Sequence, residues 1–217
     1  MRRIMLGVIR VFTTADDAIV AAHGQLIASL FGLETRSYCI PDQPLGIYDA
    51  ASHQQAVPKI VAAAKKAAED GAKAVFISCA ADPGVQECRQ VLSIPVIGAG
   101  SAAAGIGLAM GPRVGVLNLT GSTPPAIAGL LGKHLAAEAA PQGVRNTTDL
   151  LNQAGMSAAI EAANILARSA DVIVLACTGY STIGLAKVLR SIVGVPIVDA
   201  VEAGGTVAFY CLARRMA

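Results

Sequence analysis

Two of the five cysteines occupy matching places in the chain, and their surroundings indicate proton-transfer chemistry. Cys79 follows the apolar run of residues 74–78, and Cys177 follows the apolar run of residues 172–176. A helical pattern comes after each cysteine. Unpaired backbone N–H groups and the positive end of a helix lower the pKa of a nearby thiol. We therefore expect both thiols to form thiolate near neutral pH.

The two cysteines belong to two halves of the chain that resemble each other. Residues 74–109 and residues 172–209 both run from an apolar strand through a cysteine and an amphipathic helix to a short strand with a proline. Residues 7–10 likewise match residues 115–118 further upstream. This repeat predicts two similar half-domains with a cleft between them. A free cysteine can also be merely a small buried apolar residue, and we keep that interpretation for the three unmatched ones, Cys39, Cys88 and Cys211.

Apolar runs alternate with helical patterns throughout, which is typical of a parallel sheet in an α/β fold. The predicted strands are residues 4–11, 35–40, 74–78, 94–97, 114–119, 172–176 and 195–198. The predicted helices are residues 16–31, 54–70, 124–139, 149–169 and 201–214. A hydroxyl cap at Ser122-Thr123, followed by proline at the first helical position, is expected to open the third helix.

Ligands of such open sheets bind beyond the carboxyl ends of the strands, where both cysteines fall. Two thiols facing each other across a cleft are suited to inverting a stereocentre. One thiolate removes a proton from a carbon next to a carbonyl, and the opposite thiol delivers a proton from the other side. Nearby backbone N–H groups would hold the carbonyl oxygen as negative charge builds on it. The residues themselves therefore predict a racemase.

Composition argues against several other classes of protein. The chain is 54% hydrophobic with a formal net charge of +2, and its adjacent basic residues form only short pairs, which argues against nucleic-acid binding. The uncharged run of residues 90–112 is broken by Pro95 and several glycines, so we expect no membrane segment. No cysteine has the spacing of a metal site, so no metal is expected. Without a signal segment, we expect a cytoplasmic protein with reduced thiols.

Two segments resemble the cysteine motifs of hydantoin racemases in the aspartate/glutamate racemase superfamily. Residues 78–84, Ser-Cys-Ala-Ala-Asp-Pro-Gly, resemble the first motif, and residues 176–181, Ala-Cys-Thr-Gly-Tyr-Ser, resemble the second. The resemblance covers essentially the whole chain. It implies an α/β fold of two pseudo-symmetric domains, each a mostly parallel four-stranded sheet flanked by helices, with the active site in the cleft between them. The returning C-terminal helix would give one domain of residues 1–98 with 199–217 and another of residues 99–198.

The same resemblance implies that Cys79 and Cys177 are the acid/base pair, without a cofactor, acting on a 5-substituted hydantoin, allantoin or a related carbon acid. Residues around the two cysteines are then candidate substrate contacts, namely Ser78, Ala80, Ala81, Thr178 and Gly179. A homo-oligomer is also expected. The alternatives are an amino-acid racemase of the Asp/Glu type, an enzyme similar to maleate isomerase or a decarboxylase, and a two-domain protein that only binds a small molecule.

The chain departs from the hydantoin racemase pattern after its first strand. Arg10-Val11-Phe12-Thr13-Thr14 stands where that family has Asn-Pro-Asn-Ser/Thr. Arg10 either donates to a carboxylate or ring carbonyl of the substrate or is a surface arginine at a strand end. Asn118 and Thr120 end the strand that matches that of Arg10, so they either line the same cleft or form a turn. Two acidic residues are expected to cap helices, Asp82 after Cys79 and Asp199 after the last strand.

Overall fold

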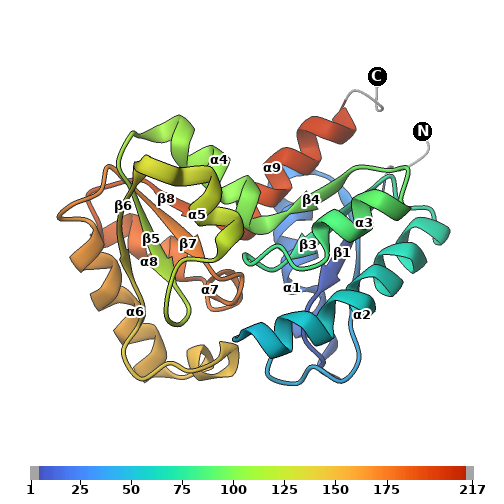
Figure 1. The fold of residues 1–217 in the computed structure, drawn as a ribbon, viewed down its shortest axis with the longest axis horizontal. Helices are drawn as coiled ribbons and strands as arrows, with labels where there is room; N and C mark the ends of the chain where they lie inside the picture. The colour runs from blue at the N-terminus through green and yellow to red at the C-terminus, as the bar shows by residue number, and fades with distance from the viewer. Residues whose placement is uncertain (1–4, 214–217) are drawn as a thin grey trace.

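The computed structural model describes residues 5–213 and contains two four-stranded sheets with identical topology (Figure 1). The first has the order β2-β1-β3-β4 and is formed by β1 (Met5–Arg10), β2 (Glu34–Cys39), β3 (Ala74–Ser78) and β4 (Val96–Gly98). The second has the order β6-β5-β7-β8 and is formed by β5 (Val114–Asn118), β6 (Leu135–Ala139), β7 (Val172–Ala176) and β8 (Ile197–Asp199). All neighbouring strands are parallel. The repeated sequence pattern is thus confirmed as a repeated fold.

Helices flank both sheets. The α-helices are α1 (Asp17–Phe31), α2 (Ala50–Glu69), α3 (Val85–Val91), α4 (Ala99–Met110), α5 (Pro125–Leu131), α6 (Gln153–Leu166), α7 (Gly179–Thr182), α8 (Leu185–Ile192) and α9 (Ala200–Ala213). Two 3₁₀ helices are η1 (Gly132–His134) and η2 (Thr147–Leu151). Ile4 and Arg214, the outermost residues of the first predicted strand and the last predicted helix, lie outside the described residues.

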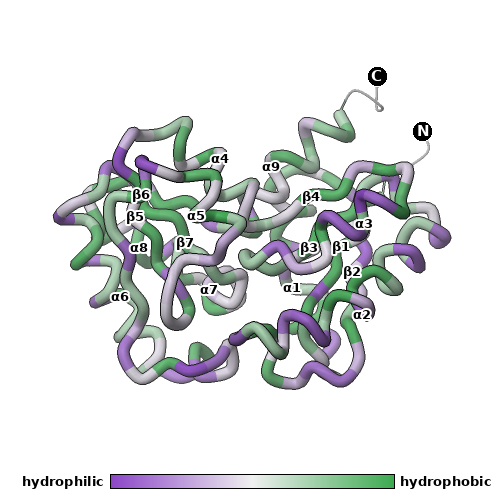
Figure 2. Tube along the Cα trace, in the orientation of Figure 1, coloured by the Kyte–Doolittle hydropathy of each residue, from purple (hydrophilic) through white to green (hydrophobic). Residues whose placement is uncertain are grey.

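The strands β3 and β7 form from apolar runs that the fold removes from water. All residues of β3 and of β7 are buried, as expected for inner strands of a parallel sheet covered on both faces. Figure 2 shows the resulting hydrophobic stretches in both halves of the molecule. The helix α1 begins where Asp16 accepts hydrogen bonds from the backbone of Ala18 and Ile19, and it ends at Gly32, whose φ is +66°.

The glycine-rich helices α4 and α9 pack within the chain and join its two halves. The helix α4 packs against α5, β7 and α9, and α9 packs in turn against α1 and β3. Gly107 of α4 lies against Val174, and a Cβ at this position would approach that side chain to 2.8 Å. A Cβ at Gly204 of α9 would overlap the ring of Phe76. Small residues are therefore required for these helices to reach the sheets.

The predicted helix of residues 124–139 is wrong in its second half. The helix α5 ends at Leu131, a turn follows at Gly132 (φ +49°), and residues 135–139 form the edge strand β6. Leu-Ala-Ala-Glu-Ala favours a helix by intrinsic propensity, but pairing with β5 covers the otherwise open edge of the second sheet. The predicted helix of residues 149–169 is likewise divided into η2 and α6, because Asn152 caps α6 by accepting from the backbone of Gly155.

Candidate active site

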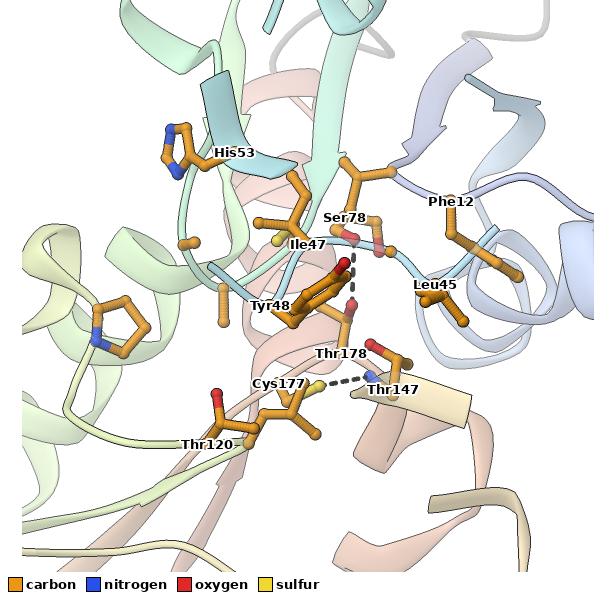
Figure 3. A pocket seen from close by; sticks show the side chains of 18 of the residues that line it. Phe12, Leu45, Ile47, Tyr48, His53, Ser78, Thr120, Thr147, Cys177 and Thr178 are labelled. Carbon is orange, nitrogen blue, oxygen red and sulfur yellow. Dashed lines mark hydrogen bonds between the residues drawn. The ribbon is translucent and has the colours of Figure 1, made fainter. Parts of the chain in front are cut away.

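A cavity of about 980 Å³ lies at the carboxyl ends of both sheets (Figure 3). Its wall includes the last residues of β1, β3, β5 and β7, together with the loop of residues 44–49 and the start of η2. The cavity brings together all ten predicted site residues: Arg10, Ser78, Cys79, Ala80, Ala81, Asn118, Thr120, Cys177, Thr178 and Gly179. The two halves of the chain thus contribute matching strand ends to one cavity.

Both thiols are largely buried in the wall of this cavity. Burial is the main reason why the pKa of Cys79 is raised to about 12; the Ala81 backbone N–H opposes this shift, and the nearby Cys177 thiol adds to it. Burial also raises the pKa of Cys177 to about 11, although the backbone N–H groups of Gly179 and Tyr180 lower it. These raised pKa values disagree with the expectation of thiolates near neutral pH, because burial disfavours the charged form of both thiols.

Short or distant helices explain why the thiol pKa values are not lowered. The helix α3 begins only at Val85, beyond the turn that follows Cys79, and α7 has just 4 residues. Neither thiol therefore lies at the positive end of a long helix. The Gly179 N–H does donate to the sulfur of Cys177 at 3.3 Å, but this and the other hydrogen bonds to the sulfur do not offset its loss of solvent.

Thr147 is a neighbour of Cys177 that the sequence did not reveal. It begins η2, lines the cavity and forms a side-chain hydrogen bond with the Cys177 thiol, which lowers the pKa of that thiol. A Cβ at Gly179 would lie 2.8 Å from the methyl carbon of Thr147 and 3.3 Å from the sulfur. Glycine is therefore required at position 179 for η2 to approach the thiol.

Arg10 is buried, so the alternative of a surface arginine is wrong. Its Nη1 donates to the carbonyl oxygens of Ile19 and Val20, and its guanidinium carbon lies 5.1 Å from the centre of the Phe12 ring. Burial lowers the pKa of Arg10 to about 10, while the Cys39 side chain opposes this shift. The guanidinium therefore stays charged at neutral pH and gives the cavity wall a fixed positive charge.

Asn118 has one amide atom without a partner in an otherwise complete hydrogen-bond chain. Its Nδ2 donates to the Thr123 hydroxyl at 3.2 Å, and that hydroxyl donates to the Glu138 carboxylate at 2.7 Å. Hydrogen bonds from Thr123 are the main reason why the pKa of Glu138 is lowered, so the carboxylate stays an acceptor. This direction leaves the buried Asn118 Oδ1 without a hydrogen bond. The Thr123 hydroxyl thus accepts from Asn118. Its sequence position predicted a cap for α5, but no side chain caps this helix.

Comparison with known proteins agrees with this arrangement of two matching halves. A family model described as Asp/Glu/Hydantoin racemase matches residues 18–208. The chain belongs to this family. A hydantoin racemase from Rhizobium meliloti is 28% identical over 178 residues, which cover 75% of this chain and 69% of the relative. Membership of the family makes the chain a racemase, which is a kind of isomerase.

Solved structures of other proteins share the fold. An allantoin racemase from Pseudomonas fluorescens superposes with a TM-score of 0.83 at 24% identity, covering 98% of this chain and 92% of that chain. An allantoin racemase from Klebsiella pneumoniae gives a TM-score of 0.82 at 22% identity, covering 98% and 89% of the two chains. At these identities the likeness establishes the architecture alone.

The floor of this racemase's cavity is crossed by hydrogen bonds between its two halves. The Thr178 hydroxyl donates to the carbonyl oxygen of Ser78 at 3.0 Å, as Figure 3 shows. His23 of α1 joins the same group, with Nδ1 2.7 Å from the Ser78 hydroxyl and Nε2 2.8 Å from the Thr182 hydroxyl. His23 is far from every cysteine along the chain, so no motif or spacing in the sequence indicates its place in the cavity wall. Its one signal was its place on the apolar, buried face of a predicted helix.

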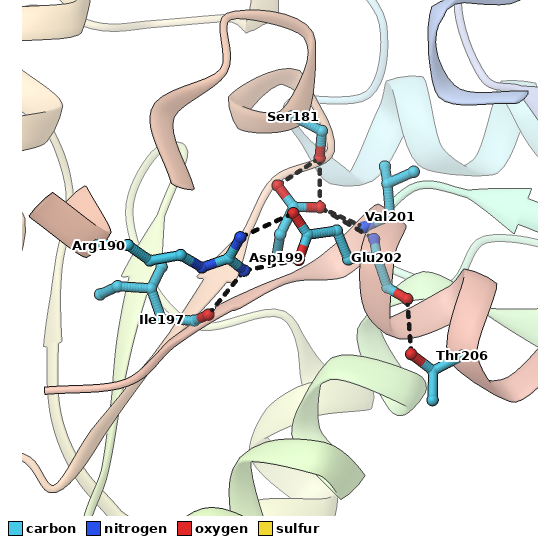
Figure 4. Close-up of polar contacts among 7 residues, drawn as sticks. All are labelled: Ser181, Arg190, Ile197, Asp199, Val201, Glu202 and Thr206. Carbon is cyan, nitrogen blue, oxygen red and sulfur yellow. Dashed lines mark hydrogen bonds and ion pairs between the residues drawn. The ribbon is translucent and has the colours of Figure 1, made fainter. Parts of the chain in front are cut away.

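The two acidic caps are arranged differently in the two halves. Asp199 accepts from the backbone of Val201 and Glu202 at the start of α9, which confirms its predicted role, and from the Ser181 hydroxyl (Figure 4). Asp82 does not cap α3. Its carboxylate instead accepts from the backbone of Gly100 and Ser101 at the start of α4, because Gly98 has no side chain to fill that place.

Within residues 5–213, three or more His, Cys, Asp or Glu side chains nowhere gather as they would around a metal ion. None of the helices in the same part of the chain is both long and apolar enough to cross a bilayer. The wall of the cavity carries two thiols, one buried guanidinium, several hydroxyl groups, the imidazoles of His23 and His53, and the carboxyl groups of Asp49 and Glu87.

Proposed function

We propose that this racemase interconverts the enantiomers of a 5-substituted hydantoin or a related cyclic carbon acid, using Cys79 and Cys177 and no cofactor. One observation carries the proposal: the two thiols come from matching strand ends, β3 and β7, and line one cavity. An inversion that runs in both directions requires a proton donor and a proton acceptor on opposite faces of one carbon. Two equivalent halves supply such a pair.

In each turnover, a thiolate takes the proton from the stereogenic carbon, and the electron pair of the C–H bond moves to the carbonyl oxygen as an enolate. The opposite thiol then protonates the carbon from its other face and becomes a thiolate. The enzyme thereby ends with its charge on the other sulfur, ready for the reverse reaction. A raised thiol pKa makes each thiolate a stronger base towards a weak carbon acid, at the cost of a smaller ionised fraction.

Cys177 is the thiol expected to ionise first, because the pKa of Cys177 is raised to about 11 and that of Cys79 to about 12. Arg10 would stabilise the enolate oxygen, since a fixed positive charge in a water-poor site favours developing negative charge. Asn118 Oδ1 would accept a hydrogen bond from a ring N–H of the substrate, which is the partner that this acceptor lacks.

The remaining predicted contacts are proposed to hold the ring. Backbone groups of Ala80, Ala81 and Gly179 and the hydroxyls of Ser78, Thr120 and Thr178 would surround its polar edge. The cavity wall is also mostly apolar, and its large apolar side chains include Phe12, Leu45, Ile47, Tyr48 and Leu151. Such a wall favours an apolar substituent over the ureido group of allantoin or the second carboxylate of an acidic amino acid. Self-association and a cytoplasmic location stay predictions from the sequence.

The decisive experiment follows enantiopure 5-benzylhydantoin in D₂O by polarimetry and NMR. We expect loss of optical rotation with deuterium entering the stereogenic carbon, and a decrease of about 10³-fold or more for C79S and for C177S, because each variant lacks one proton-transfer group. The matched control is C88S, since Cys88 is buried in the core away from the cavity. Equal rates in all four proteins would refute the two-thiol mechanism.

Allantoin, L-glutamate and maleate serve as comparison substrates in the same assay. Faster turnover of allantoin or glutamate would contradict the proposed preference for an apolar substituent. A covalent adduct on Cys79, detected by mass spectrometry with maleate, would favour the isomerase alternative.

A further inference from the structure

His23 belongs to neither cysteine motif, yet it connects the segments that carry the two thiols. It lies on α1, is 2% exposed, and forms hydrogen bonds to residues that are 55 and 159 positions away along the chain. Ser78, its partner on the first half, directly precedes Cys79. Thr182, its partner on the second half, ends α7, the short helix that follows Cys177.

The imidazole of His23 acts as a neutral bridge. Burial and the nearby Arg10 guanidinium hold the pKa of His23 well below its usual value, although a backbone hydrogen bond with Thr178 acts in the opposite direction. A neutral imidazole has one donor nitrogen and one acceptor nitrogen. Either hydroxyl partner can take either role, so both ring nitrogens are satisfied in the buried site.

The hydrogen bond from His23 to Thr182 connects the bridge to α7, the helix that contacts the Cys177 sulfur. The Gly179 and Tyr180 N–H groups that face the Cys177 sulfur are at the start of α7, and the hydroxyl bonded to His23 is at its end. A helix of 4 residues has little internal hydrogen bonding to hold its place. Its position therefore depends on external contacts such as the one to His23.

We propose that His23 is a positioning residue that keeps the two thiols opposed across the cavity, by tying Ser78, which precedes Cys79, to Thr182, which lines the cavity at the end of α7. The inference rests on the proposed two-thiol racemisation. His23 lines the cavity, but both of its ring nitrogens are bonded to hydroxyl groups, so we assign it no proton transfer with the substrate. Its contribution is geometric, and a misplacement of about 1 Å between reacting groups costs about 10²-fold in rate.

Thr182→Val tests the bridge with the least change in shape, because it removes one hydroxyl and adds one methyl group. T182V is expected to lower the racemisation kcat by about 10–100-fold with KM within about threefold of the parent value. T182S keeps the hydroxyl and is expected to recover most of the rate. The control T206V makes the same Thr→Val change at an exposed site on α9, where the hydroxyl bonds only to the Glu202 carbonyl. H23N, which keeps an amide near the Ser78 hydroxyl but cannot reach Thr182, should behave as T182V does.

The ratio of proton exchange to racemisation separates positioning from general loss of structure. If one thiol still removes the proton while the other is misaligned, deuterium returns to the same face and exchange outpaces inversion. We expect this ratio to rise about tenfold in T182V and H23N. A variant that is only partly unfolded would lose exchange and racemisation in proportion, and that result would overturn the inference, as would an unchanged kcat in both variants.

A second readout does not depend on the substrate. Release of α7 should uncover Cys177, so its alkylation rate by iodoacetamide, relative to that of Cys88, should rise about fivefold or more in T182V but not in T182S or T206V. An unchanged relative rate in T182V and H23N would overturn the positioning role, even if the parent racemises no hydantoin. Conversely, the parent protein could lack racemase activity while the relative alkylation rate of Cys177 still rises in T182V. That result would support the bridge and reject only the proposed function.

Discussion

At the scale of single residues, burial sets the ionisation of this site. Each thiol loses more stabilisation of its charged form through lost solvent than it gains from neighbouring N–H groups, so the pKa values are raised. Because a thiol is neutral when protonated, a raised pKa favours the uncharged form of both thiols through neutral pH. The thiolate fraction then grows as pH rises, and only above the pKa does it level off.

Iodoacetamide alkylation should reveal this ionisation directly. Between pH 7.5 and 9.5 we expect the rate at Cys177 to rise about tenfold per pH unit, because only the thiolate reacts and its pKa is raised to about 11. Cys79, whose pKa is raised to about 12, should react more slowly at each pH. The rates are measured by mass spectrometry of quenched peptides, with a free cysteine peptide as control, which should level off above about pH 8.5. A plateau near pH 7 for Cys177 would show that the backbone N–H groups outweigh burial.

At the scale of elements, an aspartate caps the corresponding helix in each half, α4 and α9, but the two aspartates stand at different positions in the chain. In the second half, Asp199 caps α9 from the N-cap position itself. In the first half, that position is Gly98, and Asp82 reaches across from the turn after β3 to cap α4. Gly98 has extended dihedral angles (φ −94°, ψ 139°) that any residue adopts, whereas Asp82 has a positive φ of 50° that glycine prefers. The backbone thus permits the two residues to be exchanged.

This arrangement predicts that the single changes destabilise the fold and the exchange restores it. D82G should lower the free energy of unfolding by about 1–2 kcal/mol through loss of the α4 cap. G98D should also destabilise, because its Cβ would overlap the Asp82 carboxylate. The double variant D82G/G98D should regain most of the loss, since Asp at position 98 can cap α4 as Asp199 caps α9. Thermal unfolding followed by circular dichroism measures all three. A double variant no more stable than its worse single variant would contradict this account of the cap.

The elements that the sequence predicts well are those whose residues are removed from water on every side. β3 and β7 are entirely buried, and the predicted bounds of both match the structure. Predictions fail where a distant partner decides. Leu135–Ala139 favours a helix locally and becomes a strand only because β5 lacks a neighbour on that side. Asp82 similarly bonds to α4 and not to the nearer α3.

The candidate site was likewise predictable only in part. The internal repeat located both cysteines at matching strand ends, which places them in one cavity once the two sheets face each other. His23 and Thr147 could not be found in this way, because their contacts with the cysteine segments arise from packing and leave no motif or fixed spacing. The pKa values of the thiols could not be predicted from the sequence either, since they depend on how much solvent reaches each sulfur.

At the scale of the whole molecule, the two sheets share one continuous apolar core. A single cluster of buried side chains includes Val8 and Phe76 of the first sheet, Val116 and Val174 of the second, and Leu212 of α9. The helices α4 and α9 pack between these parts. Separating the halves would expose the apolar surface that they bury against each other, which disfavours an intermediate with one folded half.

We therefore expect a single cooperative unfolding transition. One buried cysteine in each half can report the unfolding of that half. Cys88 lies in a buried cluster around the first sheet, and Cys177 lies in one around the second. Short pulses of a thiol reagent across a urea series should give the same midpoint for both cysteines, and that midpoint should coincide with loss of the circular dichroism signal. Midpoints that differ by more than about 0.5 M urea would contradict the shared core, because coincident transitions are the test of two-state behaviour.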